Sequence, residues 1–245
     1  MPDVMAADDP LPRGALSGKV AVVVGGASGM GRTAAKALAL QGARIVIADF
    51  DHARMERTVG EILHLGSSDA ALALPTDVRN DRSVASMAGD AIKAMGQVDI
   101  LLNMAGVFLQ GPLQRIKTGD WRWVIETNLL GAVRTTTALV PHMAARGSGH
   151  IVNAVSVGVV SPLTIAYDSC SAALAAFTNA LAEEMKGKGV TVSLFPIGPG
   201  GPRIGQNTRS RGMGRLLHPA GDLEEATAPS GQLVDQLIDL LHVSR

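Results

Sequence analysis

The stretch of sequence that decides the fold is residues 19–40, KVAVVVGGASGMGRTAAKALAL. Residues 19–24 form an apolar, mostly β-branched run, which predicts a buried strand, and residues 29–40 are predicted to form a helix. The turn between them has glycines at the spaced positions Gly25, Gly29 and Gly31. Glycine permits a tight turn and a close approach of the backbone to a pyrophosphate, and a helix N-terminus presents unpaired N–H groups. The stretch therefore predicts a dinucleotide site, with an ordinary strand-to-helix turn as the alternative.

The rest of the chain repeats this strand-and-helix unit. Further strands are expected at 44–48, 70–74, 98–102, 150–155 and 190–195. Further helices are expected at 51–65, 81–95, 118–145 (interrupted around Pro141), 165–186 and 232–243. The alternation predicts an α/β fold, a single doubly wound Rossmann-type domain whose parallel sheet of six strands has helices on both faces. We expect a flexible tail over 1–16, the domain over 17–245, a mobile lid or substrate loop over 198–230, and no seventh strand.

Composition excludes several other classes of protein. Hydrophobic residues make up 47% of the 245 residues and aromatic residues only 3%, while 22 basic residues balance 22 acidic ones. A nucleic-acid binder would carry more aromatic and basic residues. The single cysteine and the spacing of the six histidines predict no disulfide and no metal site. Because no apolar run approaches a membrane span and the N-terminus does not resemble a signal peptide, we expect a cytoplasmic protein without a membrane partner.

An acidic residue, Asp49, ends the second expected strand, 18 residues after Gly31. A carboxylate at this position accepts hydrogen bonds from the adenosine ribose hydroxyls and repels a 2′-phosphate, which favours NAD(H) over NADP. Arg32 counts slightly against this preference, because a guanidinium beside the turn is able to meet a phosphate. The alternative interpretation of Asp49 is a cap at the end of the strand.

Further motifs follow in a fixed order along the chain. They are Asp77-Val78 after the third strand, Asn103-Met104-Ala105-Gly106 after the fourth, Asn128 within a helix, Ser156 after the fifth strand, and Tyr167 11 residues later. With the glycine turn, this set resembles the short-chain dehydrogenase/reductase family over about residues 17–205. The resemblance implies the same fold and a set of cofactor contacts: Gly25, Ser28, Gly29, Met30, Gly31, Asp49, Asp77, Val78, Asn103, Ala105, Gly106 and Gly198.

The resemblance also implies a mechanism. Ser156 would hold the oxygen of a carbonyl or hydroxyl substrate, and Tyr167 would exchange a proton with it. The nicotinamide would exchange a hydride with the carbon, and Asn128 would hold a water relay behind the site. The resemblance implies assembly as a homodimer or homotetramer. Apolar residues near these positions indicate a hydrophobic small-molecule substrate.

One position departs from the family pattern: Ser171 stands four residues after Tyr167, where the family has a lysine. In the family this lysine grips the nicotinamide ribose and lowers the tyrosine pKa. A free tyrosine has a pKa of ~10, so alcohol oxidation, which needs the phenolate, suffers more than carbonyl reduction. Three hypotheses follow from this degenerate active site. They are an NAD(H)-dependent oxidoreductase, a non-redox catalyst (cyclase, dehydratase or isomerase) using Ser156 and Tyr167, and a catalytically silent binding protein that has lost the cofactor.

Overall fold

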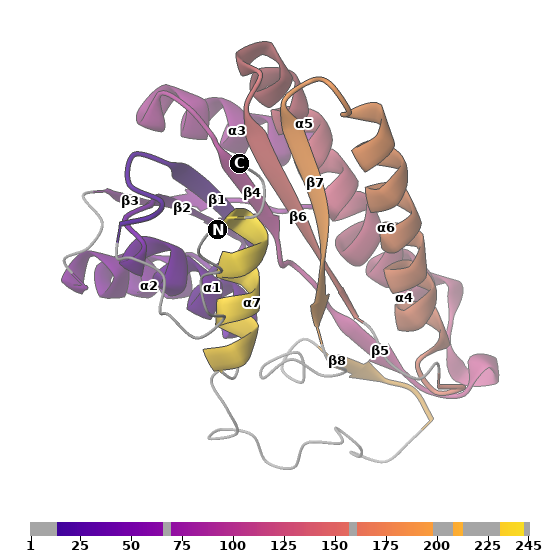
Figure 1. The fold of residues 1–245 in the computed structure, drawn as a ribbon. Coiled ribbons are helices and arrows are strands. Elements are labelled where there is room, and N and C mark those ends of the chain that lie inside the picture. The colour runs from indigo at the N-terminus through magenta and orange to yellow at the C-terminus, as the bar shows by residue number, and fades with distance from the viewer. Residues whose placement is uncertain (1–13, 66–69, 157–160, 198–207, 213–230, 243–245) are drawn as a thin grey trace.

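A parallel sheet of six strands forms the centre of the molecule in the computed structural model (Figure 1). The structure describes residues 14–65, 70–156, 161–197, 208–212 and 231–242. In spatial order the strands are β3 (Ala71–Pro75), β2 (Arg44–Asp49), β1 (Val20–Val24), β4 (Ile100–Asn103), β6 (Gly149–Ser156) and β7 (Val190–Ile197). The chain thus builds outward from β1 in one direction and then from β4 in the other. In sheets of this kind, ligands bind beyond the carboxyl ends of the strands at that switch point.

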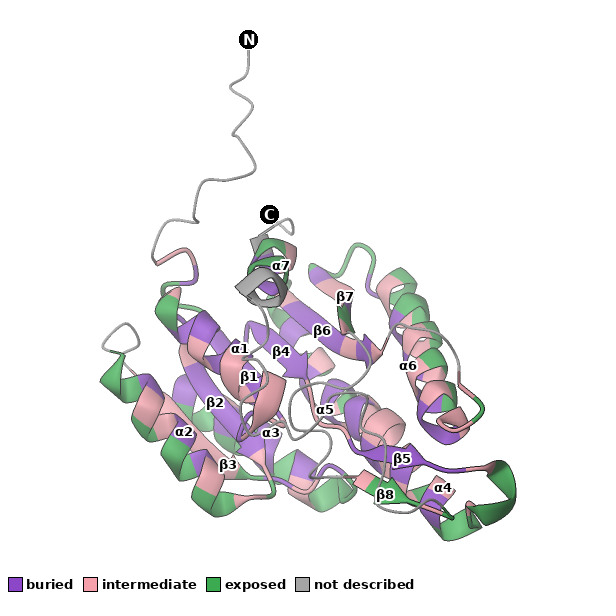
Figure 2. Ribbon diagram, turned by 90° about the horizontal axis from the view of Figure 1, so that it is seen from below, coloured by how far each residue is buried: buried purple, intermediate pink, exposed green. Residues whose placement is uncertain are grey.

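Helices cover both faces of the sheet, as predicted. On one face lie α1 (Gly29–Leu40), α2 (His52–His64) and α7 (Gly231–His242). On the other lie α3 (Asp81–Met95), α5 (Leu130–Arg146) and α6 (Ile165–Glu184) (Figure 1). Successive side chains of a strand point to opposite faces, and those of β1 enter two different apolar clusters. Figure 2 shows the buried strands between the helices. This burial on both faces explains why the strands are uniformly apolar.

The expected helix over 118–145 is broken at a different place from the prediction. The structure has α4 (Thr118–Val124), one turn of π-helix (Ile125–Leu129) and then α5, which continues through Pro141. Pro141 is exposed, so water is able to satisfy the carbonyl group that proline leaves without a donor. The predicted interruption at Pro141 is therefore wrong, and the irregular turn lies before α5.

A second sheet of two parallel strands joins segments far apart in the sequence. β5 (Phe108–Gln110) pairs with β8 (Thr208–Ser210), with Leu109 opposite Arg209 (Figure 1). Residues 208–210 belong to the segment expected to be an irregular lid, so that expectation is wrong for them. The rest of the lid, 198–207 and 213–230, lies outside the described residues. A short 3-10 turn, Leu113–Arg115, follows β5.

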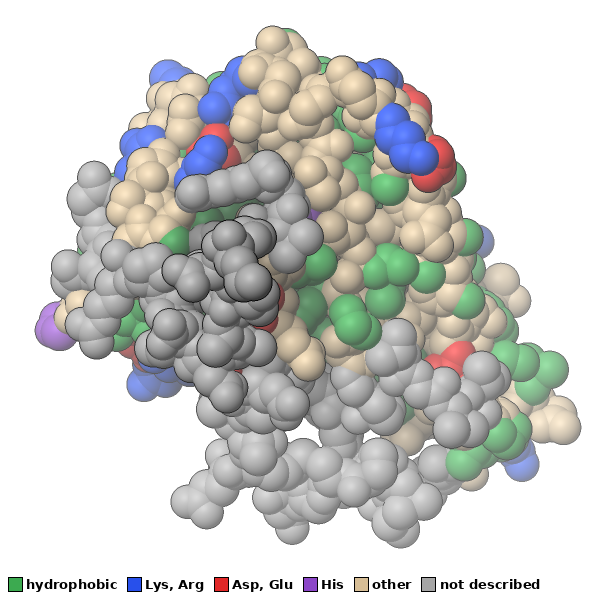
Figure 3. Space-filling view, in the orientation of Figure 1, with side chains coloured by type: hydrophobic (Ala, Val, Ile, Leu, Met, Phe, Trp, Pro, Cys, Tyr) green, Lys and Arg blue, Asp and Glu red, His purple; other side chains and the backbone are tan. Residues whose placement is uncertain are grey.

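The domain begins slightly earlier than residue 17. Leu16 is 5% exposed within the core, and its N–H donates to the Gln41 carbonyl group at 2.9 Å. The boundary expected after residue 16 is therefore too late, and residues 1–13 lie outside the described part. No helix in the described part is both long and apolar enough to cross a bilayer. On the face seen in Figure 3, basic side chains lie beside acidic ones at the upper edge, in keeping with the balanced charge.

Candidate functional site

A cavity of about 410 Å³ lies beyond the carboxyl ends of the strands at the switch point. It gathers nearly all of the site residues predicted from the sequence. Those that line it are Gly25, Ser28, Gly29, Met30, Gly31, Asp49, Asp77, Val78, Ala105, Gly106, Asn128, Ser156, Tyr167 and Ser171. Gly198 lies outside the described residues. The cavity therefore brings the predicted cofactor contacts and the predicted catalytic residues together.

The glycine turn forms one wall of the cavity and leaves no room for side chains. A Cβ atom on Gly25 would lie 2.6 Å from the Ala105 nitrogen, and one on Gly31 would lie 2.2 Å from the Gly25 oxygen. The turn is thus packed directly against the end of β4. Ser28 precedes α1, and its side chain makes no capping hydrogen bond. The N–H groups that open α1 are therefore donors for an anion.

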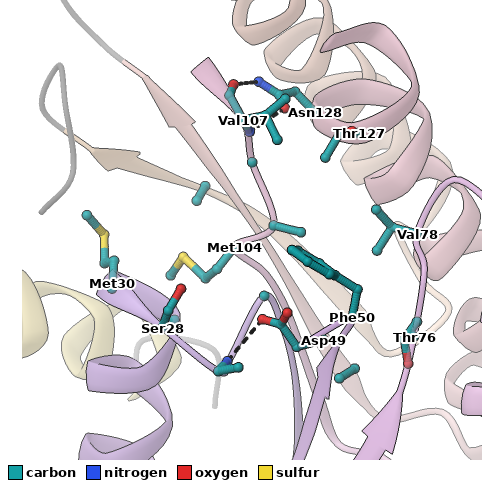
Figure 4. Close-up of a pocket in the computed structure, with 18 of the residues that line it drawn as sticks. Ser28, Met30, Asp49, Phe50, Thr76, Val78, Met104, Val107, Thr127 and Asn128 are labelled. Carbon is teal, nitrogen blue, oxygen red and sulfur yellow. Dashed lines mark hydrogen bonds between the residues drawn. The ribbon is translucent and has the colours of Figure 1, made fainter. Parts of the chain in front are cut away.

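Asp49, at the end of β2, holds this turn in place. Its Oδ2 accepts from the Ala27 N–H at 3.1 Å (Figure 4), and its Oδ1 accepts from the Asp51 N–H at 3.2 Å. Burial raises the pKa of the Asp49 carboxyl group, and these hydrogen bonds oppose the rise. Each carboxylate oxygen accepts two hydrogen bonds, so capacity remains for a ligand. The Asp49 side chain is therefore able to hold the turn and to accept hydrogen bonds from a ligand at the same time.

Tyr167 and Ser156 enter the same cavity from α6 and from the end of β6. The ring of Phe108 meets that of Tyr167 edge-on, with centroids 4.9 Å apart and an interplanar angle of 71°. Burial raises the pKa of the Tyr167 phenol, a hydrogen bond with the Ser156 side chain opposes this, and the charge of Asp168 adds to the rise. At neutral pH the phenol is therefore protonated and able to donate.

Asn128 lies in the π-helical turn and is bonded to the backbone of one residue. Its Oδ1 accepts from the Val107 N–H and its Nδ2 donates to the Val107 carbonyl group, both at 2.8 Å (Figure 4). The side chain therefore fixes the segment between β4 and β5. The water relay implied for Asn128 stays a prediction.

Asn103 lies at the end of β4 but does not line the cavity. Its side chain is buried, donates to the Asn153 Oδ1 at 2.8 Å and accepts from the Thr135 hydroxyl at 2.7 Å. The cofactor contact implied for Asn103 stays a prediction, and in this structure its side chain is directed into the core. A buried polar side chain needs partners, and Asn103 finds them in the core beneath the site.

Several lining residues were not predicted. Phe50 is 70% exposed and lies beside Asp49 (Figure 4), and Thr76, Met104, Trp123 and others also line the cavity. An aromatic residue directly after the acidic strand end was a sequence signal for Phe50, and Met104 lies within the motif at 103–106. For Thr76 and Trp123 no local pattern pointed to the site. Among the described residues, no group of three or more His, Cys, Asp or Glu is placed to hold a metal ion.

Comparison with known proteins identifies the family. Residues 19–211 match the short chain dehydrogenase family. The chain belongs to this family. It is 35% identical to the (2S)-[(R)-hydroxy(phenyl)methyl]succinyl-CoA dehydrogenase subunit BbsD of Thauera aromatica, over 76% of this chain and 73% of that protein.

Two solved structures of similar proteins contain nicotinamide cofactors. The 3-ketoacyl-(acyl-carrier-protein) reductase of Brucella melitensis, complexed with NADH, is 31% identical with a TM-score of 0.70, over 75% of this chain and 76% of that one. A metagenomic short-chain oxidoreductase in complex with NADP is 31% identical with a TM-score of 0.69, over 76% and 84%. The two neighbours therefore bind different forms of the cofactor.

In this member of the short-chain dehydrogenase family, Ser171 makes a pair of contacts that the sequence did not predict. Its Oγ accepts from the Ser156 N–H at 2.8 Å and donates to the Ser156 carbonyl group at 3.1 Å. One hydroxyl group on α6 thus joins both peptide groups of a residue at the end of β6.

Proposed function

We propose that this protein is an NAD(H)-dependent reductase that acts on the carbonyl group of an apolar small molecule. The observation that carries the proposal is the single cavity lined both by the glycine turn with Asp49 and by Ser156 with Tyr167. Much of the remaining wall is apolar: Met104, Ala154, Leu174 and Ile197. Such a wall suits a substrate with little charge around its reacting carbonyl group.

The residues present fit a nicotinamide dinucleotide. The N–H groups that open α1 suit a pyrophosphate, and the spare acceptor capacity of Asp49 suits ribose hydroxyl groups. The exposed ring of Phe50 beside Asp49 offers a surface on which an adenine ring would stack. When bound, the cofactor supplies the hydride.

The charges near Asp49 favour NAD(H) over NADP(H). A carboxylate repels a 2′-phosphate, and the basic side chains nearby are paired with carboxylates. Arg32 donates to Glu61 at 3.0 Å, away from the cavity lining. Arg54 and Arg79 line the cavity, and each forms an ion pair with an aspartate. Because each arginine is paired with a carboxylate, the positive charge near Asp49 that would attract a 2′-phosphate is reduced.

The protonated phenol of Tyr167 favours reduction over oxidation. In reduction, the carbonyl carbon gains a hydride and Tyr167 gives its proton to the carbonyl oxygen while Ser156 donates a hydrogen bond to that oxygen. Oxidation requires the phenolate instead, and burial raises the pKa of Tyr167 further from neutrality. The absence of a cation at position 171 therefore matters less for reduction.

The test is NADH consumption with a panel of aldehydes and ketones. We expect stoichiometric conversion by the wild type and a loss of about 10²- to 10⁴-fold in Tyr167→Phe. The affinity for NADH, measured by calorimetry, should be the same in both proteins, which separates a lost proton donor from a lost cofactor site.

Two results would contradict this proposal in different ways. Conversion of a carbonyl substrate by the wild type without NADH consumption supports a non-redox catalyst, because the cofactor would then be structural. If Tyr167→Phe retains every activity of the wild type, the phenol has no catalytic role and both enzyme hypotheses fail.

A further inference from the structure

Ser171 is connected by its position to both Ser156 and Tyr167. It stands four residues after Tyr167 on α6, so the two side chains lie on the same face of the helix. Both line the cavity. The Ser171 hydroxyl group also reaches across from α6 to the end of β6, through two hydrogen bonds to Ser156. Ser156 at the end of the strand is thus tied to the helix that carries Tyr167.

Ser156 is the last residue of β6 and, among the described strands, is paired there on one side only. β7 pairs with β6 as far as Ser156, opposite Ile197, whereas β4 pairs with β6 only as far as Asn153. There the Ser171 hydroxyl group accepts from the Ser156 N–H and donates to its carbonyl group. A hydroxyl group does both, whereas a lysine ammonium group only donates. A lysine at position 171 is therefore unable to satisfy the Ser156 N–H.

We propose that Ser171 is a positioning residue that clamps the backbone of Ser156 and so sets the Ser156–Tyr167 geometry for reduction. This inference rests on the proposed function. It assigns the serine a role of its own, different from that of the family's lysine. Through the Ser156 hydroxyl group the clamp reaches the phenol, since the hydrogen bond from Ser156 opposes the effects of burial and of Asp168 on the Tyr167 pKa.

The first test needs no activity. Hydrogen–deuterium exchange at the Ser156 amide, followed by NMR, should be faster in Ser171→Ala than in the wild type, by about tenfold or more. Ser171→Thr keeps the hydroxyl group and should restore slow exchange. Ser169→Ala is the matched control on α6, because that exposed hydroxyl group donates to the Ile165 carbonyl group of its own helix. Unchanged exchange in Ser171→Ala would overturn the clamp.

The second test asks whether Ser171 acts through Ser156. We expect Ser171→Ala to lower kcat by about tenfold, since small misplacement of reacting groups is costly, with the NADH dissociation constant within about twofold of wild type. In a Ser156→Ala background there is no hydroxyl group left to position, so Ser171→Ala should then have little further effect. An equal loss in both backgrounds would show a merely structural role and overturn the proposal.

Restoring the family's lysine gives a third test. Ser171→Lys should behave like Ser171→Ala in exchange and in kcat, because the acceptor for the Ser156 N–H is lost in both. A kcat above that of the wild type in Ser171→Lys would overturn the proposal, because loss of the clamp would then not impair reduction. If the wild type itself consumes no NADH, the proposed function fails, while the exchange experiment still tests the clamp.

Discussion

Replacing Gly31 by alanine tests whether the glycine turn depends on the close approach of Gly31 to Gly25, the first residue of the turn. The backbone of Gly31 lies outside the left-handed region, so any effect of the substitution comes from the new methyl group. That Cβ atom would lie 2.2 Å from the Gly25 oxygen, whereas ordinary contacts begin at 3.4 Å. The Gly25 N–H donates to the Ala48 carbonyl group at 2.8 Å, which opposes movement of the turn.

The overlap of roughly 1 Å must be relieved by displacing backbone, and overpacking of this kind costs about 1–3 kcal/mol. The same displacement moves the N–H donors at the start of α1. We therefore expect the free energy of unfolding of Gly31→Ala to fall by that amount. The dissociation constant for NADH should rise by about tenfold or more.

Gly60→Ala is the matched control, because Gly60 lies within α2 and nothing lies within 4 Å of its Cβ position. There alanine should stabilise the helix by about 0.5–1 kcal/mol and leave NADH binding unchanged. Urea unfolding and calorimetric titration measure both quantities. Wild-type NADH affinity together with an unchanged free energy of unfolding in Gly31→Ala would refute the argument from contact.

Three further perturbations have expected outcomes. Asp49→Asn removes one repulsive charge, so the affinity for NADPH relative to NADH should rise by about tenfold, and equal ratios in competition titrations would contradict the role of Asp49. Asp120→Ala removes the acceptor for the Arg211 guanidinium group at 2.9 Å and for the Lys117 N–H at 3.1 Å. The free energy of unfolding, measured in urea, should fall by about 1 kcal/mol or more, because a helix cap alone contributes that amount. Burial lowers the pKa of His150 from 6.5 to about 4, so the unfolded chain binds the extra proton below pH 6.5. Stability should fall as the pH drops from 6.5 to 4, by about 3 kcal/mol in total. His150→Gln should lose that slope, and parallel slopes in the two proteins would contradict this.

Secondary structure was predictable where local signals mark both ends of an element. α1 and α3 match their predicted bounds to the residue, because glycines open the first and a left-handed Gly96 ends the second. The small sheet of β5 and β8 was not predictable, since strands of three residues carry no periodicity and the pair forms only when distant segments meet. The π-helical turn was not predicted. Its residue Asn128 bonds the Val107 backbone, a tertiary contact that the local sequence pattern does not contain.

The candidate site was predictable as a set of positions but not as a set of contacts. Motif order along the chain placed Asp49, Asn128 and Tyr167 at one cavity because parallel strands end at one edge of the sheet. The direction of the Asn103 side chain was not predictable. It depends on hydrogen bonds to Thr135 in α5 and to Asn153 in β6, which lie outside the motif. Neither the order of the motifs nor the composition indicated that the Ser171 side chain bonds to the Ser156 backbone.

Three polar side chains at this site form hydrogen bonds with backbone groups rather than with one another. Asp49 holds the glycine turn at Ala27, Asn128 holds Val107, and Ser171 holds Ser156. Each joins a segment that lines the cavity to a different element of the fold. Side chains on separate segments with no shared partner affect stability nearly additively. Substitutions at Asp49 and Ser171 should therefore impair cofactor binding and the catalytic step separately. A strong coupling between them would mean that the two ends of the cavity move as one unit.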